Sequence, residues 1–433
     1  MLNSDVKAIS PPIPIFESHI VAVAHQSLAL TIPNVNPSSR KTQLLLIFLT
    51  ILLSTIGFGV CIPVLPMYAE KFGATEFQNG MLVGVFSLVM FFSAPLWGKL
   101  SDRVGRRPVL IISIIGSAIG YFVMGWGGSL IWLYVARIID GASGGNVATA
   151  QAYIADISTP EERSKAMGMI GAAFGLGFII GPAVGGILAQ WHPSAPFYFV
   201  GVLCLINALL VYTSLPESLP LEKRRQSHTE QPIKEMLHHA DGPLYVSVAA
   251  SYLVCLAAFS IMTAVFALFA QKRFGMDELA VGYVMAAIGI VGVIMQGGVI
   301  RRLLPKYGEV KMARAGMVAL LLSFILLPLV GDKPSLYAVS CLIAIGNSLV
   351  QPTLTGLASR SVDAMWQGRA MGLLQSSASL GRGIGPILGG WLLHFDSGLS
   401  HYGRSPFWAA AVLMIITLGI ATRLHLPKRA NAS

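Results

Sequence analysis

Charged side chains are scarce in this sequence of 433 residues. Asp, Glu, Lys and Arg together make up 12% of the chain, about half the usual share, whereas the hydrophobic residues Ala, Val, Ile, Leu, Met, Phe, Trp, Tyr and Cys make up 54%. A soluble surface needs more charge than this, and a disordered chain or a coiled coil does too. The composition therefore excludes those classes and indicates an integral membrane protein.

Cysteines are few, and an ATP-binding signature is absent. Cys61, Cys204, Cys255 and Cys341 fall in four different apolar stretches, so we interpret them as small buried hydrophobic residues and expect neither disulfides nor a metal site. No phosphate-binding loop of the type GxxxxGK[ST] occurs, which argues against ATP as the energy source. No cofactor is expected.

The sequence does contain apolar stretches about 20 residues long, the length that a helix needs to cross the hydrocarbon core. In lipid each segment must satisfy its own backbone hydrogen bonds, so these stretches are predicted to be helices and not barrel strands. We count twelve, at residues 43–65, 79–98, 108–127, 130–154, 166–189, 196–215, 243–270, 278–300, 312–331, 335–358, 368–393 and 405–423. The predicted fold class is an all-α integral membrane protein.

The basic residues predict the orientation, because loops rich in Lys and Arg stay cytoplasmic. With both termini inside, 23 of the 30 basic residues lie in cytoplasmic segments and five in outer loops. The formal net charge of +10 is then a topology signal, helped by anionic lipid of the bilayer, and requires no nucleic acid. We expect a multi-pass protein of the cell (inner) membrane.

The chain divides into two related halves. The long polar segment 216–242 is predicted to be a cytoplasmic linker between six-helix bundles at 43–215 and 243–425, with cytoplasmic tails at 1–42, expected to be disordered, and 426–433. GLGFIIGPAVGG at 175–186 aligns with SLGRGIGPILGG at 379–390 at a shift of 204 residues. Such internal duplication is common in secondary transporters, so we predict two pseudo-symmetric bundles.

The aligned residues of this repeat are Gly177, Gly181, Pro182, Gly185 and Gly186 in the first half and Gly381, Gly385, Pro386, Gly389 and Gly390 in the second. Glycines four residues apart share a helix face and allow a neighbouring backbone to approach closely. The prolines favour a bend. Two interpretations stay open: ordinary helix packing, or a seam between the halves at which the fifth and eleventh helices slide.

Three motifs resemble those of one transporter family. They are GKLSDRVGRR at 98–107, the stretch RIIDGASGGN that begins at Arg137, and GPAVGG at 181–186. In this order they resemble the motifs of the major facilitator superfamily, and the third resembles the motif of its drug–proton antiporters. GFGVCIPVLP at 57–66 is similar to tetracycline and multidrug efflux members. The resemblance implies the twelve-helix fold of that family.

The resemblance also implies a cytoplasmic latch after the second span. The matching residues are Gly98, Asp102, Arg103, Gly105 and Arg106, with Asp156, Glu161 or Glu162 as candidate partners. From the residues themselves, the two glycines allow backbones to approach in a tight turn, and Asp102 can pair with helix ends or cations. Alternatively, the basic residues only obey the positive-inside rule. The matching stretch 298–309 lacks the acid, so only the first half is expected to carry a full latch.

Three charged residues lie well inside apolar spans, where an ionisable group is costly and usually functional. They are Arg137, Asp140 and Arg382. Arg137 and Asp140 are three residues apart on one helix face. Either Asp140 titrates and exchanges a proton when the solute perturbs the pair, or the two residues form a permanent structural ion pair. Arg382 either attracts an anionic group or bonds to carbonyls freed by the glycine-rich bend.

A cavity with so little charge is expected to be lined by neutral polar and aromatic groups. The candidate contacts are Phe58, Asn146, Gln151, Tyr252, Asn347, Gln351 and Gln375, each of which can equally serve helix packing. Such a lining suits an amphipathic, mostly apolar solute. Tetracycline and multidrug pumps commonly carry an acid in the first helix, where this chain has Ser54 and Thr55. That departure counts against tetracycline itself.

Together these features predict a monomeric secondary transporter that exports a small drug-like or metabolite molecule in exchange for protons by alternating access. An alternative keeps the fold and reverses the direction, as a proton-coupled importer of a sugar or organic acid. A membrane-embedded enzyme would need a catalytic cluster within the bilayer, and the sequence places none there. A non-transporting sensor is disfavoured by the duplication.

Overall fold

The computed structural model describes residues 40–158, 160–219, 224, 235–236, 241–363, 366–398 and 401–425, without the side chains of 40, 41, 160–168 and 368. Within these ranges there is no β-strand. The helices are α2 (Arg40–Glu70), α3 (Glu76–Val104), α4 (Arg106–Trp126), α5 (Leu130–Ala142), α6 (Asn146–Ile157), α7 (Pro160–Trp191), α8 (Ala195–Ser214), α11 (Gly242–Phe274), α12 (Glu278–Ile294), α13 (Ile300–Tyr307), α14 (Glu309–Leu326), α15 (Lys333–Arg360), α16 (Gln367–Phe395) and α17 (Arg404–Ala421). A π-helical turn, Met295–Val299, joins α12 to α13, and the 3₁₀ turn Leu327–Leu329 follows α14.

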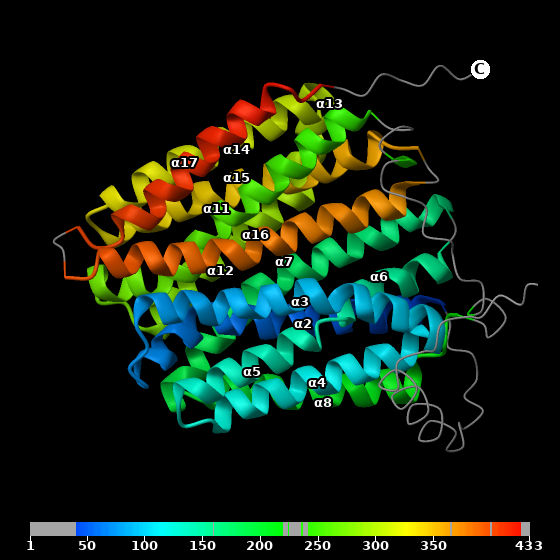
Figure 1. Cartoon of the computed structure of the whole chain (residues 1–433), viewed down its shortest axis with the longest axis horizontal. Helices are drawn as coiled ribbons and strands as arrows, with labels where there is room; N and C mark the ends of the chain where they lie inside the picture. The colour runs from blue at the N-terminus through cyan, green and yellow to red at the C-terminus, as the bar shows by residue number, and fades with distance from the viewer. Residues whose placement is uncertain are drawn as a thin grey trace, which may run out of the picture.

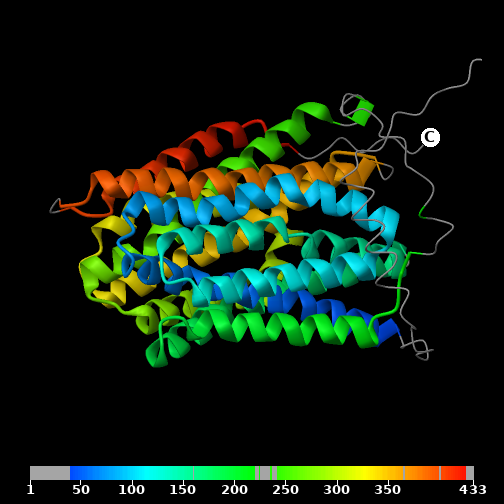
Figure 2. The same cartoon turned by 60° about the horizontal axis from the view of Figure 1, so that its bottom comes forward.

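The helices form two groups that follow the order of the chain. Figure 1 places α2–α6 and α8 on one side and α11, α14, α15 and α17 on the other, with α7, α12 and α16 between them. Figure 2 views the same helices, which run lengthwise through the molecule, from a second side. Each group has its own apolar core, and the core of the second group also takes in Ile62 and Met67 of α2. The division agrees with the predicted halves; the described part of the chain leaves out most of the predicted linker and both tails.

Helices stand at all twelve predicted spans. Ten are long and apolar enough to cross a membrane on those two criteria. The other two predicted spans correspond to α16, which is 29 residues long, and to the pair α5 and α6. All four cysteines are free, and Cys61, Cys204 and Cys255 are buried as expected.

The prediction of one continuous helix over 130–154 is wrong. The chain leaves the helix at Ser143–Gly145, between α5 and α6. The run Gly-Ala-Ser-Gly-Gly at 141–145 explains the break, since each glycine in a helix interior costs about 1 kcal/mol relative to alanine. Side chains of neighbouring helices satisfy the freed carbonyls: Ser93 donates to Gly141 O at 2.9 Å, Trp97 Nε1 donates to Ala142 O at 2.6 Å, and Ser113 donates to Ser143 O.

The repeat glycines use two faces of their helices. A Cβ on Gly177, Gly181 or Gly185 would lie within 3.2 Å of α2 atoms, and one on Gly381, Gly385 or Gly389 would come as close to α11. These contacts stay within each half. Another face crosses between the halves, where a Cβ on Gly186 would lie 2.8 Å from Leu279 Cα and one on Gly390 would lie 2.8 Å from Gly80 Cα. The packing interpretation therefore describes the glycines that contact α2 and α11 within each half. The seam interpretation describes Gly186 and Gly390, which contact the other half.

The contact between α3 and α16 is tight at one end and open at the other. Gly80 meets Gly390 and the carbonyl of Pro386, yet within the described part of the chain a Cβ on Gly98 or Gly372 would meet nothing within 4 Å. Gly98 is 18 residues from Gly80, and Gly372 is 18 from Gly390, so each pair shares one helix face, about 27 Å apart along the axis. The close approach expected at Gly98 is absent in this structure. We call the closed side the Glu76 end and the open side the Gly105 end.

The break between α5 and α6 gives a testable expectation. Trp97→Phe keeps an aromatic ring against Gly145 but removes the N–H that satisfies Ala142 O. We expect the free energy of unfolding to fall by about 1 kcal/mol, the usual effect of losing one hydrogen bond. The measurement is the thermal unfolding midpoint of detergent-purified protein. Trp126→Phe, at a side chain that is 69% exposed, is the matched control; equal midpoints for both variants would contradict the assignment.

Candidate functional site

A buried ion pair lies in the middle of the first half, just before the helix break. Arg137 Nη1 is 3.2 Å from Asp140 Oδ2, and the two side chains are 1% and 7% exposed. The guanidinium also donates through Nε to Leu82 O at 3.3 Å and lies over the ring of Phe86 at 4.1 Å. Each extra contact helps to offset the cost of removing the arginine charge from water.

The structure shows which neighbour the Asp140 side of α5 packs against. A Cβ on Gly120 of α4 would lie 3.1 Å from Asp140 Cβ, so the carboxylate side packs into the first half. Asp140 as a whole residue is 5% exposed. In this conformation the pair is closed off from solvent, and the titrating role of Asp140 stays a prediction.

Aromatic residues connect this pair to the boundary between the halves. The ring of Phe58 lies 6.0 Å from that of Phe86 and 5.8 Å from that of Phe178, edge to face. Phe58 and Phe178 are partly buried and pack against the core of the second half. The guanidinium of Arg137, Phe86, Phe58 and Phe178 thus form a continuous series of contacts from the interior of the first half to the second.

In the second half, Arg382 is partly exposed, and its side chain donates one hydrogen bond to a described residue, from Nη2 to Ser379 Oγ at 3.2 Å. The described residues offer it no ion pair and no carbonyl acceptor. The interpretation in which Arg382 bonds to carbonyls freed by the bend is therefore wrong for this structure. The helix bonds near Pro386 do not need it.

The remaining candidate contacts fall into two kinds. Gln151, Asn347, Gln351 and Gln375 are partly exposed, and Gln351 donates to Asn347 Oδ1 at 3.3 Å. Asn146 is 9% and Tyr252 5% exposed; Asn146 donates to Ser54 at 2.7 Å, and Tyr252 belongs to the second core. Asn146 and Tyr252 therefore serve packing here, and a solute contact at any of these side chains stays a prediction.

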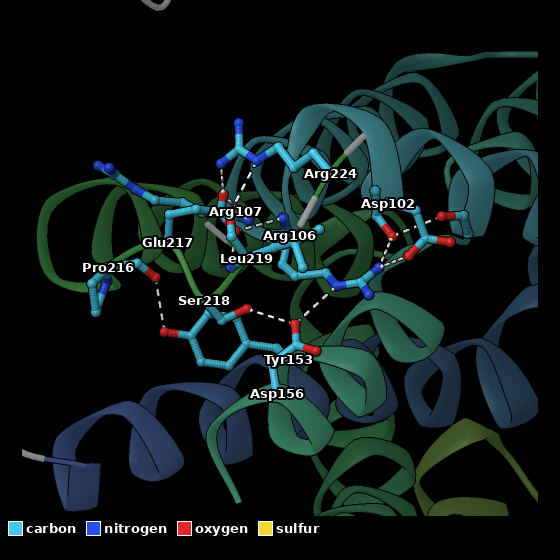
Figure 3. A network of polar contacts seen from close by, with 12 residues as sticks. Asp102, Arg106, Arg107, Tyr153, Asp156, Pro216, Glu217, Ser218, Leu219 and Arg224 are labelled. Atoms are coloured by element: carbon cyan, nitrogen blue, oxygen red, sulfur yellow. Dashed lines mark hydrogen bonds and ion pairs between the residues drawn. The ribbon is translucent and has the colours of Figure 1, made fainter. Parts of the chain in front are cut away.

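At the Gly105 end, Arg106 joins two of the predicted latch acids (Figure 3). Its Nη1 lies 2.6 Å from Asp102 Oδ1, and its Nε lies 3.1 Å from Asp156 Oδ2. Asp156 also accepts from Ser218 Oγ at 2.9 Å. All of these residues belong to the first half or to the segment directly after it. The side chains of Glu161 and Glu162 lie outside the described part, and the gating role of the network stays a prediction.

Glu217 is a member that the sequence analysis missed. Its carboxylate accepts from the backbone N–H of Arg106 at 2.8 Å and of Arg107 at 3.1 Å, so it caps the positive end of α4. Gly105, with φ +115°, precedes these residues, and a Cβ there would lie 2.4 Å from Glu217 Oε2. Only glycine therefore fits between α3 and α4 at this position. Glu217 is 112 residues further along the chain, so no local motif could reveal it.

The second half carries a smaller pair at the corresponding positions. Glu309 Oε1 lies 3.4 Å from Arg360 Nη2. These residues stand 203 and 204 positions after Arg106 and Asp156, so the cation and the acid have exchanged places. The stretch 298–309 was expected to lack an acid, but its last residue, Glu309, forms this pair. That only the first half carries a full latch stays a prediction.

A second missed cluster joins the halves at the Glu76 end. The carboxylate of Glu76, 8% exposed, lies 2.7 Å from Lys272 Nζ, 3.4 Å from His394 Nδ1 and 3.1 Å from Ser397 Oγ. Lys272 also lies over the ring of Tyr402, whose pKa is raised by burial and by the neighbouring acids Glu76, Glu70 and Asp396. One acid of the first half is thus held by a cation and a histidine of the second. In sequence these charges looked like ordinary loop residues.

Comparison with known proteins is consistent across sequence and structure. A model of the Major Facilitator Superfamily matches residues 47–367 and 306–433. Multidrug resistance protein 2 of Bacillus subtilis (strain 168) is 32% identical over 389 residues, which cover 88% of this chain and 95% of that protein. Tetracycline resistance protein, class B, of Escherichia coli is 32% identical over 343 residues, covering 78% and 85%. The crystal structure of the human organic anion transporter MFSD10 (TETRAN) matches with a TM-score of 0.68 at 25% identity, covering 88% and 99%.

The two acids that hold Arg106 are expected to differ in their contribution to stability. Asp102 is 61% exposed, so Asp102→Asn should change the free energy of unfolding by no more than about 0.5 kcal/mol. Asp156 is 22% exposed and also holds Ser218, so Asp156→Asn should cost about 1 kcal/mol. Thermal unfolding midpoints of the two purified variants test the order. A larger loss for Asp102→Asn would refute this description of the network.

Proposed function

The chain belongs to the major facilitator superfamily of membrane transporters, and we propose that it exports small, amphipathic, drug-like molecules in exchange for protons. Its relatives include proteins named for multidrug resistance and for tetracycline resistance. No catalytic reaction is needed to account for any of the sites described. The match to the human organic anion transporter MFSD10 leaves the charge of the solute open.

The observation that carries this proposal is the one-sided contact between the halves. Backbones touch at Gly80 and Gly390 and leave Gly98 and Gly372 without neighbours, so the present state opens toward the Gly105 end. If the halves rock against each other, Gly98 and Gly372 can meet while the Glu76 end opens. Alternating access requires this exchange of an open and a closed end.

The charged clusters at the two ends support the same movement. The Glu76 cluster crosses between the halves, so its ion pairs must separate when that end opens. The Arg106 network lies within the first half and can stay intact while the halves move. The positive-inside pattern supports a cytoplasmic location for the Gly105 end and for both termini. The proposed mechanism requires only one copy of the chain.

We assign proton coupling to Asp140. Among the described residues it is the carboxylate that lies deepest within an apolar span, and burial in lipid makes an isolated charge costly. When substrate separates Arg137 from Asp140, the carboxylate loses its partner and becomes easier to protonate. The break at Ser143–Gly145 is three residues away, so a shift of α6 relative to α5 can open the pair.

The test of this assignment is transport by purified protein in liposomes under an imposed pH gradient, with ethidium, a cation, and 2-naphthoate, an anion, as separate solutes. Asp140→Asn should reduce gradient-driven accumulation to the level of protein-free liposomes, because its side chain cannot exchange a proton. Solute-for-solute exchange without a gradient should survive, since that half-cycle needs no net proton movement. Asp140→Glu, which keeps the acid, is the matched control and should retain coupling.

Undiminished gradient-driven transport in Asp140→Asn would identify the pair as a structural ion pair and refute the coupling assignment. If the unmodified protein accumulates its solute only along the proton gradient, in the manner of a symporter, the direction of transport is reversed and the importer alternative holds.

A further inference from the structure

Arg382 lies on a face of α16 that is turned toward neither neighbouring helix nor lipid. Gly381, Gly385 and Gly389 contact α11, whereas Gly383 and Gly390 contact α3. Ile384 and Trp391, 46% and 47% exposed, point outward from the bundle. At 100° per residue, the remaining face carries Gln375, Ser379 and Arg382, at spacings of four and three residues. All three are partly exposed, so this polar stripe borders solvent-accessible space inside the molecule.

The guanidinium of Arg382 has most of its hydrogen-bonding capacity unused. It carries five N–H donors, and the structure gives it one acceptor, Ser379 Oγ at 3.2 Å. Other deeply placed cations have acids: Arg137 has Asp140 and Arg106 has two carboxylates. Among the described residues no carboxylate forms an ion pair with Arg382. A permanent charge in the middle of a span, held without an acid, is costly and calls for a partner that arrives from outside the chain.

The repeat shows which residue of the first half occupies the position equivalent to Arg382. The shift of 204 residues that aligns Gly177 with Gly381 also aligns Phe178 with Arg382. Phe178 therefore occupies the equivalent inward face of α7, where it contacts Phe58 edge to face and packs toward the second half. The two halves thus present unlike walls, aromatic from the first half and cationic with neutral amides from the second.

We propose that Arg382 binds an anionic group of the transported molecule, a carboxylate or sulfonate, while the apolar body of that molecule lies against Phe58 and Phe178. The planar fork of a guanidinium matches such a group with two parallel hydrogen bonds. Gln375, seven residues earlier on the same face of α16, supplies a neutral donor. This proposal rests on the transporter function above and narrows its solutes to amphipathic, aromatic anions.

The experiment measures equilibrium binding of 2-naphthoate and of uncharged 2-naphthamide to the purified full-length protein in micelles. Binding itself is the readout, so it does not depend on whether transport is proton-coupled or outward. In Arg382→Gln the affinity for naphthoate should fall at least about tenfold, as expected for loss of a charge-assisted pair, and the affinity for naphthamide should stay unchanged. Arg382→Lys should recover part of the naphthoate affinity.

A matched variant separates the contribution of the aromatic surface to binding from that of Arg382. Phe178→Leu removes the aromatic surface without changing the charge, and it should lower the affinities for naphthoate and for naphthamide by the same factor. Unfolding midpoints close to that of the unmodified protein establish that each variant is folded. If Arg382→Gln does not fold, Arg382→Lys is compared with the unmodified protein instead. The lysine ammonium cannot form the bidentate contact, so this variant should have a lower affinity for naphthoate and an unchanged affinity for naphthamide.

Three results would overturn the proposal. They are equal naphthoate affinity in Arg382→Gln and the unmodified protein, no naphthoate binding by the unmodified protein, and displacement of naphthoate by phosphatidylglycerol, which would assign the arginine to a lipid headgroup. Failure of gradient-driven transport of both ethidium and 2-naphthoate, with naphthoate binding intact and dependent on Arg382, would refute the proton-driven export function and leave this binding site standing.

Discussion

The architecture depends on how closely backbones can approach at the boundary between the two halves. Most of that boundary is made by α3 with α16 and by α7 with α12, and at the closed end glycines let their main chains come within van der Waals contact. A methyl group at Gly80 or Gly390 would collide with the opposite backbone. The contact is therefore confined to one end, and the same small-residue surfaces stay available at the other end for a second arrangement.

The few charges inside the membrane spans differ between the two halves. Inside the spans of the first half, Arg137 and Asp140 neutralise each other beside the helix break. Inside the spans of the second half, Arg382 forms no ion pair among the described residues and has a single hydroxyl partner. We infer that the first half holds the proton and the second half the charged end of the solute, so that movement between the halves couples the two.

Sequence periodicity and spacing predicted the helices, their order and the repeat, because each depends on residues near in sequence or on a repeated pattern. Asp102 and Asp156 became candidate partners of Arg106 through the resemblance to a family motif. Three features were not predicted from the sequence. The break after Ala142 depends on Ser93, Trp97 and Ser113 reaching it from other helices. Glu217 caps α4 from over a hundred residues away, and the Glu76 cluster gathers charges that look like ordinary loop ends. All three are set by tertiary contact.

The account is tested most directly by crosslinking cysteines placed at Gly98 and Gly372 in a variant whose four native cysteines are replaced. Neither position has a neighbour within 4 Å in the present structure, so the substitutions themselves should be tolerated. We predict that a disulfide forms under oxidising conditions during turnover, that it stops transport, and that reduction restores it. Transport that continues at full rate while the two cysteines never crosslink would contradict the claim that the halves close at this end.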